Sequence, residues 1–426
     1  MNKKIISASL LMVSLCTASM FANPKQENVN VKKEGAEIPF KVLKKTDAGV
    51  EIRKGGFGSD ACAYPGDSSK FYLITDRGPN IDYKGPEGKG KLFPVPEFNP
   101  EIGLFQIQKD GTVKLLKTIS LKNPDGKKIT GLPNPNGKGA TGEIAYDLKD
   151  NILGLDEYGL DSEGLVAMND GSFWVSDEYG PHIVHFSANG NELERISPYG
   201  MTTNGRKIPS VLSKRRANRG MEGLAKTPDE KFLVGIMQST LHNPSKKEIV
   251  NNRLIRIVKF ELATGKTWQY LYQQNKETDS CCGITALSND EFIVIERDGN
   301  FAGEKEAHKY LYKINLKDAT DVNGDMTLEN GMLIDGKTLE QCSQKEVLDA
   351  GIVFVKKELI TDLVTEIGYA HDKLEGLWLL NDNTICVAND NDFALIEKDN
   401  KLCQKILPGT EKPEDDVVYS IKFRGK

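Results

Sequence analysis

The sequence lacks any excess of positive charge. Its 426 residues carry 56 Lys and Arg against 61 Asp and Glu, which gives a formal net charge of −5. Proteins that bind nucleic acid usually present a basic face, so the composition argues against nucleic acid as a partner. Long apolar runs are equally scarce. Beyond the first residues no stretch is long enough to cross a bilayer, and we expect no membrane span.

Histidine and the common catalytic motifs are also scarce. The chain has 5 His residues, which do not cluster, and it contains neither HExxH nor GxSxG. Without the GxSxG elbow, a Ser-His-Asp hydrolase has no support in the sequence. His182 and His185 fall on one face of an expected strand, where ordinary packing is favoured over a shared metal ion.

Two segments imitate known binding loops but lack essential residues. The stretch DVNGDMTLE, from Asp321, has Met326 where an EF-hand loop needs Gly and Met332 where it needs the bidentate Glu. The stretch GLPNPNGKGAT, from Gly131, has the wrong spacing for a phosphate-binding loop. We interpret the first as a turn and reject the second as a phosphate site.

The N-terminal segment is typical of a secretory signal peptide. Residues 1–22, MNKKIISASLLMVSLCTASMFA, carry two lysines, a short apolar run and then small residues. We expect cleavage after Ala22, and a bacterial protein that is periplasmic or secreted. A lipoprotein cleaved at Cys16 is the alternative, but Leu15 is too large for that signal. Residues 23–426 are then expected to form a single domain and a monomer.

Cysteine is sparse. Six cysteines would remain after cleavage: Cys62, Cys281, Cys282, Cys342, Cys386 and Cys403. None of them has CxxC spacing, so zinc is not expected. Adjacent Cys281 and Cys282 are expected to bond to other cysteines, or to stay buried and reduced, rather than to bond to each other. The connectivity cannot be read from the sequence.

One motif recurs along the chain. Four stretches align without gaps, from EGLVAMNDGSFWVSDEYG at Glu163 to copies at Glu222, Cys282 and Glu375; a fifth begins at Ser59 and has a two-residue insertion. Each has an acid, a Gly, an apolar run, a polar turn and a second apolar run that is rich in β-formers. This pattern predicts a β-hairpin. A fixed repeat of this kind is the signature of repeat architectures.

A second pair of apolar runs usually follows each motif, as in HIVHFSANGNELERI, RLIRIVKFELATGKTWQYLY, KYLYKINLKDATDV and FALIEKDNKLCQKIL. Two hairpins form a four-stranded antiparallel sheet, and several such sheets form a β-propeller. We therefore predict an all-β propeller. Five motifs and one weak unit between about residues 100 and 160 predict six blades, with seven as the alternative. The segments FKVLKKTDAGVEI and VVYSIKF, near the two ends, are expected to share a blade.

Acidic side chains bracket each motif. Equivalent positions of a propeller converge on its central channel, so we expect these carboxylates to crowd one mouth, where cations would offset their repulsion. Carboxylate oxygens suit Ca²⁺. The candidate metal ligands are Asp76, Glu163, Asp177, Glu178, Glu222, Glu296, Asp298, Glu375 and Asp390; Asn389 is a weaker candidate. For any single Glu, strand-start hydrogen bonding is an equally good interpretation.

Basic residues recur beside the acids: Arg77, Arg219, Arg297 and Lys373, with His371 nearby. The planar fork of Arg matches phosphate or carboxylate. Acids that hold a metal, next to bases that bind an anion, suit metal-assisted phosphoester hydrolysis. The alternative is a set of ion pairs that joins neighbouring blades.

Several of these motifs together resemble one known family. TDRGPN, SEGLVAMNDGSFWVSDEYGPHIVHFSANG, NRGMEGLAKTPD, ERDG and LYKINLKDATDVNG are similar to the bacterial family called "esterase-like activity of phytase", or phytase-like domain proteins. The resemblance runs from about Gly55 to the end of the chain. It implies an exported propeller whose repeated acids support a phosphoesterase-type activity. Two positions depart from the pattern, because Cys282 replaces a Glu and Asp60 only roughly occupies the first.

These observations lead to three functional hypotheses. The first is a calcium-dependent hydrolase of a small anionic phosphoester. Metal-bound water would be its nucleophile, Glu163, Glu222 and Glu375 would hold metal or act as general base, and Arg77, Arg219, Arg297 and Lys373 would bind the phosphate. The second is a calcium-dependent lactonase or esterase on the same scaffold. The third is a non-catalytic binding platform with structural calcium.

Overall fold

Every copy of the repeated motif folds into the antiparallel hairpin that the sequence predicts. The turns follow from local chemistry. In the hairpin that spans Ser162 to Asp177, Gly171 has a φ of +86° and Asp170 Oδ1 accepts a hydrogen bond of 2.8 Å from the backbone N–H of Ser172. A short acidic side chain that accepts a hydrogen bond from the backbone N–H two residues later, together with a following Gly, is typical of a tight turn.

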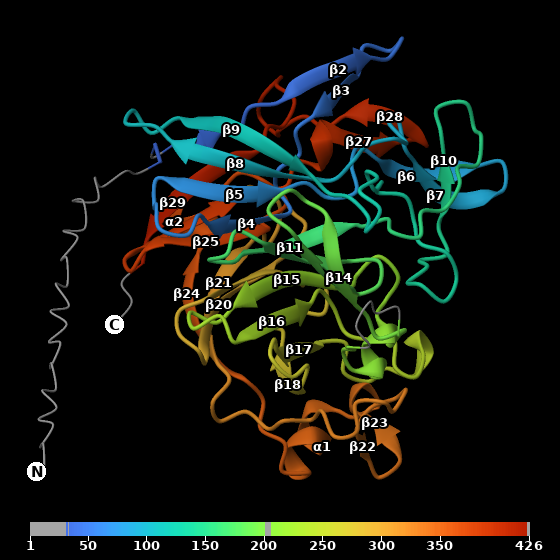
Figure 1. Cartoon of the computed structure of the whole chain (residues 1–426), viewed down its shortest axis with the longest axis vertical. Helices are drawn as coiled ribbons and strands as arrows, with labels where there is room; N and C mark the ends of the chain where they lie inside the picture. The colour runs from blue at the N-terminus through green and yellow to red at the C-terminus, as the bar shows by residue number, and fades with distance from the viewer. Residues whose placement is uncertain (1–30, 33, 201–205, 424–426) are drawn as a thin grey trace, which may run out of the picture.

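The computed structural model describes residues 31–32, 34–200 and 206–423 (Figure 1), so the expected signal peptide lies outside the described residues.

The hairpins pair with further strands to form five four-stranded antiparallel sheets, which we call blades one to five in chain order. From the inside outward, blade one consists of β4 (Asp60–Ala63), β5 (Lys70–Ile74), β8 (Glu101–Ile107) and β9 (Val113–Ser120). Blade two consists of β11 (Ser162–Ala167), β12 (Phe173–Asp177), β13 (Ile183–Phe186) and β14 (Glu192–Ile196). Blade three consists of β15 (Met221–Lys226), β16 (Phe232–Met237), β17 (Leu254–Glu261) and β18 (Thr267–Gln273). Blade four consists of β19 (Ser280–Ala286), β20 (Glu291–Arg297), β21 (Lys309–Asn315) and β24 (Lys356–Asp362). Blade five consists of β25 (Gly376–Asn381), β26 (Thr384–Ala388), β29 (Val417–Lys422) and β1 (Ala36–Glu37).

The innermost strands form a closed ring. β4, β11, β15, β19 and β25 each contact the next strand in that order, and β25 contacts β4 again. Aromatic side chains fill the gaps between blades. The rings of Phe71 and Trp378 stack at 4.7 Å between blades one and five, and Tyr72 meets Phe173 edge to face at 5.0 Å between blades one and two. The fold is therefore the predicted all-β propeller.

The described residues contain five blades, so the prediction of six is wrong. The expected extra unit between about residues 100 and 160 does not form a sheet of its own. Its first part supplies β8 and β9, the outer strands of blade one, and its last strand, β10 (Ile144–Tyr146), joins an insertion. A long segment separates β5 from β8 in the sequence. Because of this separation, the sequence pattern predicted two blades where the structure has one.

An N-terminal strand closes the ring, although not the one expected. Ala36 pairs with Val418 and Glu37 with Val417, so β1 is the outer strand of blade five. The predicted closing segment FKVLKKTDAGVEI instead forms a separate hairpin of β2 (Lys41–Lys45) and β3 (Glu51–Lys54).

Three insertions gather on one side of the ring (Figure 1, upper right), and we call them together the cap. They are the β2–β3 hairpin, the sheet of β6 (Ile81–Gly85), β7 (Gly88–Leu92) and β10, and the hairpin of β27 (Leu395–Lys398) and β28 (Lys401–Gln404). The last of these is FALIEKDNKLCQKIL, which was expected in a blade. A shared apolar cluster that includes Ile52, Ile81, Tyr146 and Leu395 holds the three insertions together.

A fourth insertion separates β21 from β24 at the lower edge of Figure 1, so only the first half of KYLYKINLKDATDV is a strand. It contains β22 (Leu333–Ile334), β23 (Lys337–Thr338), the 3-10 helix η3 (Leu339–Gln341) and α1 (Gln344–Asp349). A fully buried ion pair of 2.7 Å between Arg256 and Glu340 attaches this insertion to blade three. The remaining elements are α2 (Leu363–Ile367), η1 (Ser210–Lys214), η2 (Lys246–Glu248) and η4 (Asp392–Ala394).

Within the described ranges, no helix has the length and apolarity needed to cross a bilayer. The six cysteines that these ranges contain are unpaired, and Cys281 and Cys282 are buried. This agrees with the buried, reduced alternative for that adjacent pair.

Candidate functional site

A cavity of about 610 Å³ opens at the mouth of the channel where the inner strands begin. All five blades contribute polar side chains to its lining, and the cap covers it with Ile81, Lys91, Leu395 and Ile396 among others. The lining includes eleven acidic and six basic side chains. A cleft built from convergent charged groups is the default candidate for a functional site.

A β-bulge lies at the repeated acid in blades two and three. The pairing register shifts between Ser162 and Leu165 in blade two and between Met221 and Gly223 in blade three, so Glu163 and Glu222 lie at irregular points of their strands. Bulges re-aim side chains beside functional sites. Glu375 precedes the equivalent strand of blade five and lines the same cavity.

The Gly after each acid is required by close packing around the channel. A Cβ on Gly164 would lie 2.4 Å from the backbone nitrogen of Leu224 in the next blade. A Cβ on Gly223 would lie 2.9 Å from that of Ile284, and one on Gly283 would lie 2.6 Å from the carbonyl oxygen of Glu375. The repeated acid–Gly pair therefore reflects the approach of neighbouring inner strands, as expected where two backbones come close.

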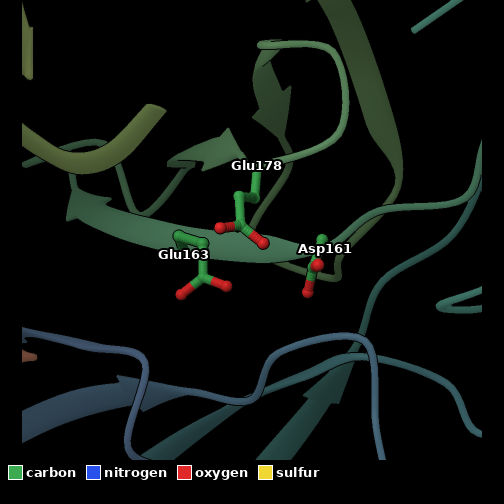
Figure 2. Close-up of side chains that lie close together, drawn as sticks. All are labelled: Asp161, Glu163 and Glu178. Carbon is green, nitrogen blue, oxygen red and sulfur yellow. The ribbon is translucent and has the colours of Figure 1, made fainter. Parts of the chain in front are cut away.

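Three carboxylates form the most compact acidic group in the cavity. Asp161 precedes β11, Glu163 lies within it, and Glu178 follows β12, so the three side chains lie side by side (Figure 2). One oxygen from each can be chosen such that all three lie within 4.8 Å of one another. We call these residues the carboxylate trio.

Burial and mutual repulsion raise the pKa of every member of the trio. For Glu163, burial is the largest cause and the charge of Glu222 the next. For Glu178 the same two causes act in the same order. Burial also raises the pKa of Asp161, although the guanidinium of Arg77 opposes this. A second positive charge at the trio would therefore be strongly favoured.

Glu222 and Glu375 titrate near neutrality. Burial raises the pKa of Glu222 to about 7, against the lowering effect of Arg297 and Lys373. Burial raises the pKa of Glu375 to about 8, where Lys373 lowers it and Asp390 raises it. Carboxyl groups with such values are suited to proton transfer near pH 7.

All four predicted basic residues line the cavity: Arg77, Arg219, Arg297 and Lys373. Three of them are held by carboxylates of the same cavity. Arg77 Nη1 lies 3.2 Å from Asp161, and Lys373 Nζ lies 2.7 Å from Asp390. His371 is not among the lining residues; its ring bonds to Glu414 and to Tyr419 instead.

Six of the nine predicted metal ligands line the cavity: Asp76, Glu163, Glu178, Glu222, Glu375 and Asp390. The other three, Asp177, Glu296 and Asp298, do not line it, and each has a partner elsewhere. Asp177 lies 3.0 Å from His182 Nδ1, Glu296 accepts from Tyr272 and Lys357, and Asp298 pairs with Lys309 at 2.6 Å.

The pleat of the strands explains this division. Successive side chains of a strand point to opposite faces, so only one member of an acidic doublet can face the channel. Glu178 lines the cavity and Asp177 does not; Asp390 lines it and Asn389 does not. In blade four Arg297 occupies the inward position, which turns Glu296 and Asp298 away.

Two blades depart from the repeated Glu, as the sequence indicated. Cys282 is fully buried, and burial raises the pKa of its thiol well above the usual range. Asp60 is buried as well, and it accepts a 2.7 Å hydrogen bond from the backbone N–H of Leu165. It braces the next inner strand and does not line the cavity.

Several lining residues were not predicted. They include Asp161, Glu143, Arg216, Asn218, Gln238, Ser280 and Asp392, together with the cap. Asp161 could have been found as the acid two positions before the repeated Glu of blade two. Gln238 replaces an acid at the end of the second strand of blade three, where its amide donates to Glu178 at 3.2 Å.

His182 and His185, which the sequence places on one face of a strand, share no ligand. His182 bonds to Asp177 and Arg195, whereas His185 bonds to Ser172 and stacks on Trp174.

Comparison with known proteins gives one family. Residues 53–393 match the phytase-like family, described as "Esterase-like activity of phytase". An uncharacterized secreted protein of Arthroderma benhamiae is 29% identical over 296 residues, which cover 54% of this chain and 57% of that protein. The match thus spans little more than half the length of this curated relative.

Solved structures resemble the chain only loosely. A periplasmic gluconolactonase of Pseudomonas aeruginosa is 10% identical, with 92% of this chain and 98% of that chain covered and a TM-score of 0.33. A protein of unknown function from Dyadobacter fermentans is 9% identical, with 91% and 99% covered and a TM-score of 0.37.

Proposed function

Because this chain belongs to the phytase-like family, described as having the esterase-like activity of phytase, we propose that it is a hydrolase that cleaves a phosphoester in the capped cavity with the help of a divalent cation, Ca²⁺ in the first instance. The carboxylate trio carries this proposal. Its three buried side chains supply only oxygen donors, within 4.8 Å of one another, and hard divalent cations prefer oxygen ligands.

The carboxylate trio also contains a buried oxygen that lacks a hydrogen-bond donor and could bind such a cation. Asp161 Oδ2 is buried without a hydrogen-bond donor among the described residues, although Arg77 lies 3.2 Å away. An unsatisfied buried acceptor is costly, and a cation held by the trio would reduce that cost. When bound, it would polarise the ester and lower the pKa of water bound to it.

The remaining roles follow from charge and protonation. Glu222 lines the cavity, and burial raises its pKa to about 7, which suits it to accept a proton near neutral pH. We assign it as general base. Among the predicted basic residues that line the cavity, Arg219 supplies positive charge for the anionic part of the substrate, whereas Arg77, Arg297 and Lys373 are paired with carboxyl groups of the same cavity.

We further propose that this activity is exported from the cytoplasm. The N-terminal pattern of residues 1–22 supports this, as does the relative from Arthroderma benhamiae, which is described as a secreted protein. Four of the six described cysteines, Cys281, Cys282, Cys342 and Cys386, are buried, and buried thiols react slowly, so their reduced state does not oppose export.

The proposal is tested by the hydrolysis of p-nitrophenyl phosphate and bis(p-nitrophenyl) phosphate, with calcium and with a chelator. We expect turnover that chelation removes and calcium restores. Glu222→Gln should lower kcat by about 100-fold or more, within the range for loss of a general base, with an unchanged melting curve. The control is Glu277→Gln, the same chemical change at an exposed residue outside the cavity.

Three outcomes would contradict the assignment. Hydrolysis of lactones with none of phosphoesters would make the protein a lactonase. Calcium binding without turnover of any ester would make it a binding platform. Unchanged turnover in Glu222→Gln would remove that residue from the mechanism.

A further inference from the structure

Four of the six basic side chains that line the cavity already lie within ion-pair distance of carboxyl groups. Arg77 pairs with Asp161 and Glu143, Lys91 with Asp82, Arg297 with Glu375, and Lys373 with Asp390 and Asp392, all at 2.5 to 3.5 Å. An anion that approaches one of these groups must compete with a carboxylate in hydrogen-bond contact. These four positions are therefore poor places for the charged group of a substrate.

Arg216 and Arg219 differ from the other four. Neither forms an ion pair with any residue of the described chain, and the guanidinium of Arg219 donates only to Ser280 Oγ, at 3.2 Å. A tight turn brings the two together: the backbone N–H of Arg219 donates to the carbonyl of Arg216 at 3.0 Å, with Asn218 at a φ of +55° between them. Arg216 is exposed at the cavity mouth and Arg219 is half-buried.

The turn is fixed beside the carboxylate trio. Asn218 Oδ1 accepts a 2.8 Å hydrogen bond from Arg77, whose other contacts include Asp161. At the other end, Gly220 packs so closely on Glu178 that a Cβ there would lie 2.2 Å from the Glu178 carbonyl oxygen. The turn is thus attached to two members of the trio, and the arginine pair stands next to the group that would hold the cation.

We propose that Arg216 and Arg219 are the anion-binding subsite of this cavity, and that its ligand is an ester with one anionic phosphoryl group joined to an apolar or uncharged group. The assignment of this ligand as a substrate rests on the proposed function, but the subsite itself does not. Arg216 and Arg219 meet across one tight turn and line the same cavity, and guanidinium groups match the oxygens of a phosphoryl group.

Two further observations agree with this subsite. Partial desolvation and then the positive charge of Arg219 lower the pKa of Arg216, while the charge of Glu178 raises it, so an anion between the two arginines would relieve their mutual repulsion. The cap places Ile81, Leu395 and Ile396 over the same cavity, where they provide an apolar contact for the rest of the ligand.

The charges of the side chains that line the cavity also disfavour a ligand with several phosphate groups. A second anionic group would meet either the eleven acidic side chains of the lining or basic groups that are already paired. A cation at the trio would neutralise the trio but would leave Asp76, Asp390 and the other acids in place.

The test is calorimetric binding of two non-hydrolysable probes, phenylphosphonate and benzene-1,4-bisphosphonate, to the whole protein at a fixed calcium concentration. Phenylphosphonate should bind the wild type, and R216Q/R219Q should weaken that binding at least tenfold. Lys91→Gln serves as the matched control, because this basic residue lines the cavity but is paired with Asp82; its affinity should stay within about twofold. The bisphosphonate should bind no more tightly than phenylphosphonate.

The proposal is overturned if R216Q/R219Q binds phenylphosphonate like the wild type, if the wild type does not bind it, or if the bisphosphonate binds the wild type at least tenfold more tightly. Melting curves and the single variants check that the turn still folds. Because binding is measured without turnover, probe binding that depends on the arginine pair in a protein that hydrolyses nothing would refute the proposed hydrolase and keep the subsite.

Discussion

Arg297 Nη2 lies 2.5 Å from Glu375 Oε1, across the junction between blades four and five and at the wall of the cavity. Both side chains are more than nine-tenths buried. The pair joins two blades where the inner strands of blade four and blade five meet, and it holds Glu375 beside Glu222.

Arg297→Met should destabilise the protein by about 1 to 3 kcal/mol, because it leaves the carboxyl of Glu375 buried without its hydrogen-bond donor. Replacement of Glu375 by Gln in that background should cost little more, since the unpaired Glu375 is expected to be protonated already. Urea unfolding measures both values. Arg253→Met, at an exposed residue, is the control and should change stability by less than about 0.5 kcal/mol. A cost for Arg297→Met as small as that of the control would contradict the pair's role.

Stability without calcium should fall as the pH rises from about 5 to 8. Glu222 has a folded pKa of about 7 and Glu375 of about 8, so the folded protein keeps protons that the unfolded chain has released. Stability that is present below the unfolded pKa is then lost as the pH rises through the folded pKa. For Glu222 alone the loss is about 3 kcal/mol. Asp177 and Asp392 have lowered pKa values and act in the opposite direction, but only below about pH 4. Burial lowers the pKa values of His182, His185 and His242, which act in the opposite direction below about pH 6.5.

Calcium should oppose this loss, and should therefore raise the melting temperature more at pH 8 than at pH 5. Scanning calorimetry in chelator and in calcium tests both statements. A melting temperature in chelator that rises between pH 5 and 8 would show that the cavity acids are charged and well compensated without a cation.

Gly164→Ala should destabilise the fold by about 1 to 3 kcal/mol, the usual range for forced overpacking, because its Cβ would lie 2.4 Å from the Leu224 nitrogen. The strain should also displace neighbouring Glu163 and weaken calcium binding. Gly154→Ala is the control, since a Cβ there meets nothing within 4 Å. Equal melting temperatures for the two variants would mean that the inner strands can move apart freely.

The repeat allowed much of the fold and the site to be predicted. Glu163, Glu222 and Glu375 line one cavity because equivalent residues of a propeller converge, and this follows from the alignment of the copies alone. Convergence did not reveal which member of each acidic doublet faces inward. Asp177 and Glu178 are equivalent in composition, and only the strand register separates them.

Other features depended on contacts between distant segments. Arg216 belongs to no repeat, and its importance arises from the absence of a carboxylate partner, which requires coordinates. The blade count failed because residues 75–100 separate β5 from β8, so that one blade looked like two. The cap hairpin at 395–404 has the same alternating pattern as a blade strand, and only its packing against Ile81 and Tyr146 shows where it belongs.

The pairing of β1 with β29 has a consequence for the order in which the site can be built. Ala36 and Glu37 are among the first described residues to be synthesised, and they must wait for Val417 and Val418, which are among the last. Until that pairing forms, blade five lacks its outer strand and the ring has a seam beside Glu375 and Asp390. The inner ring itself closes where β25 meets β4. Because the cavity draws side chains from every blade, it is complete only when segments from both ends of the described chain have come together.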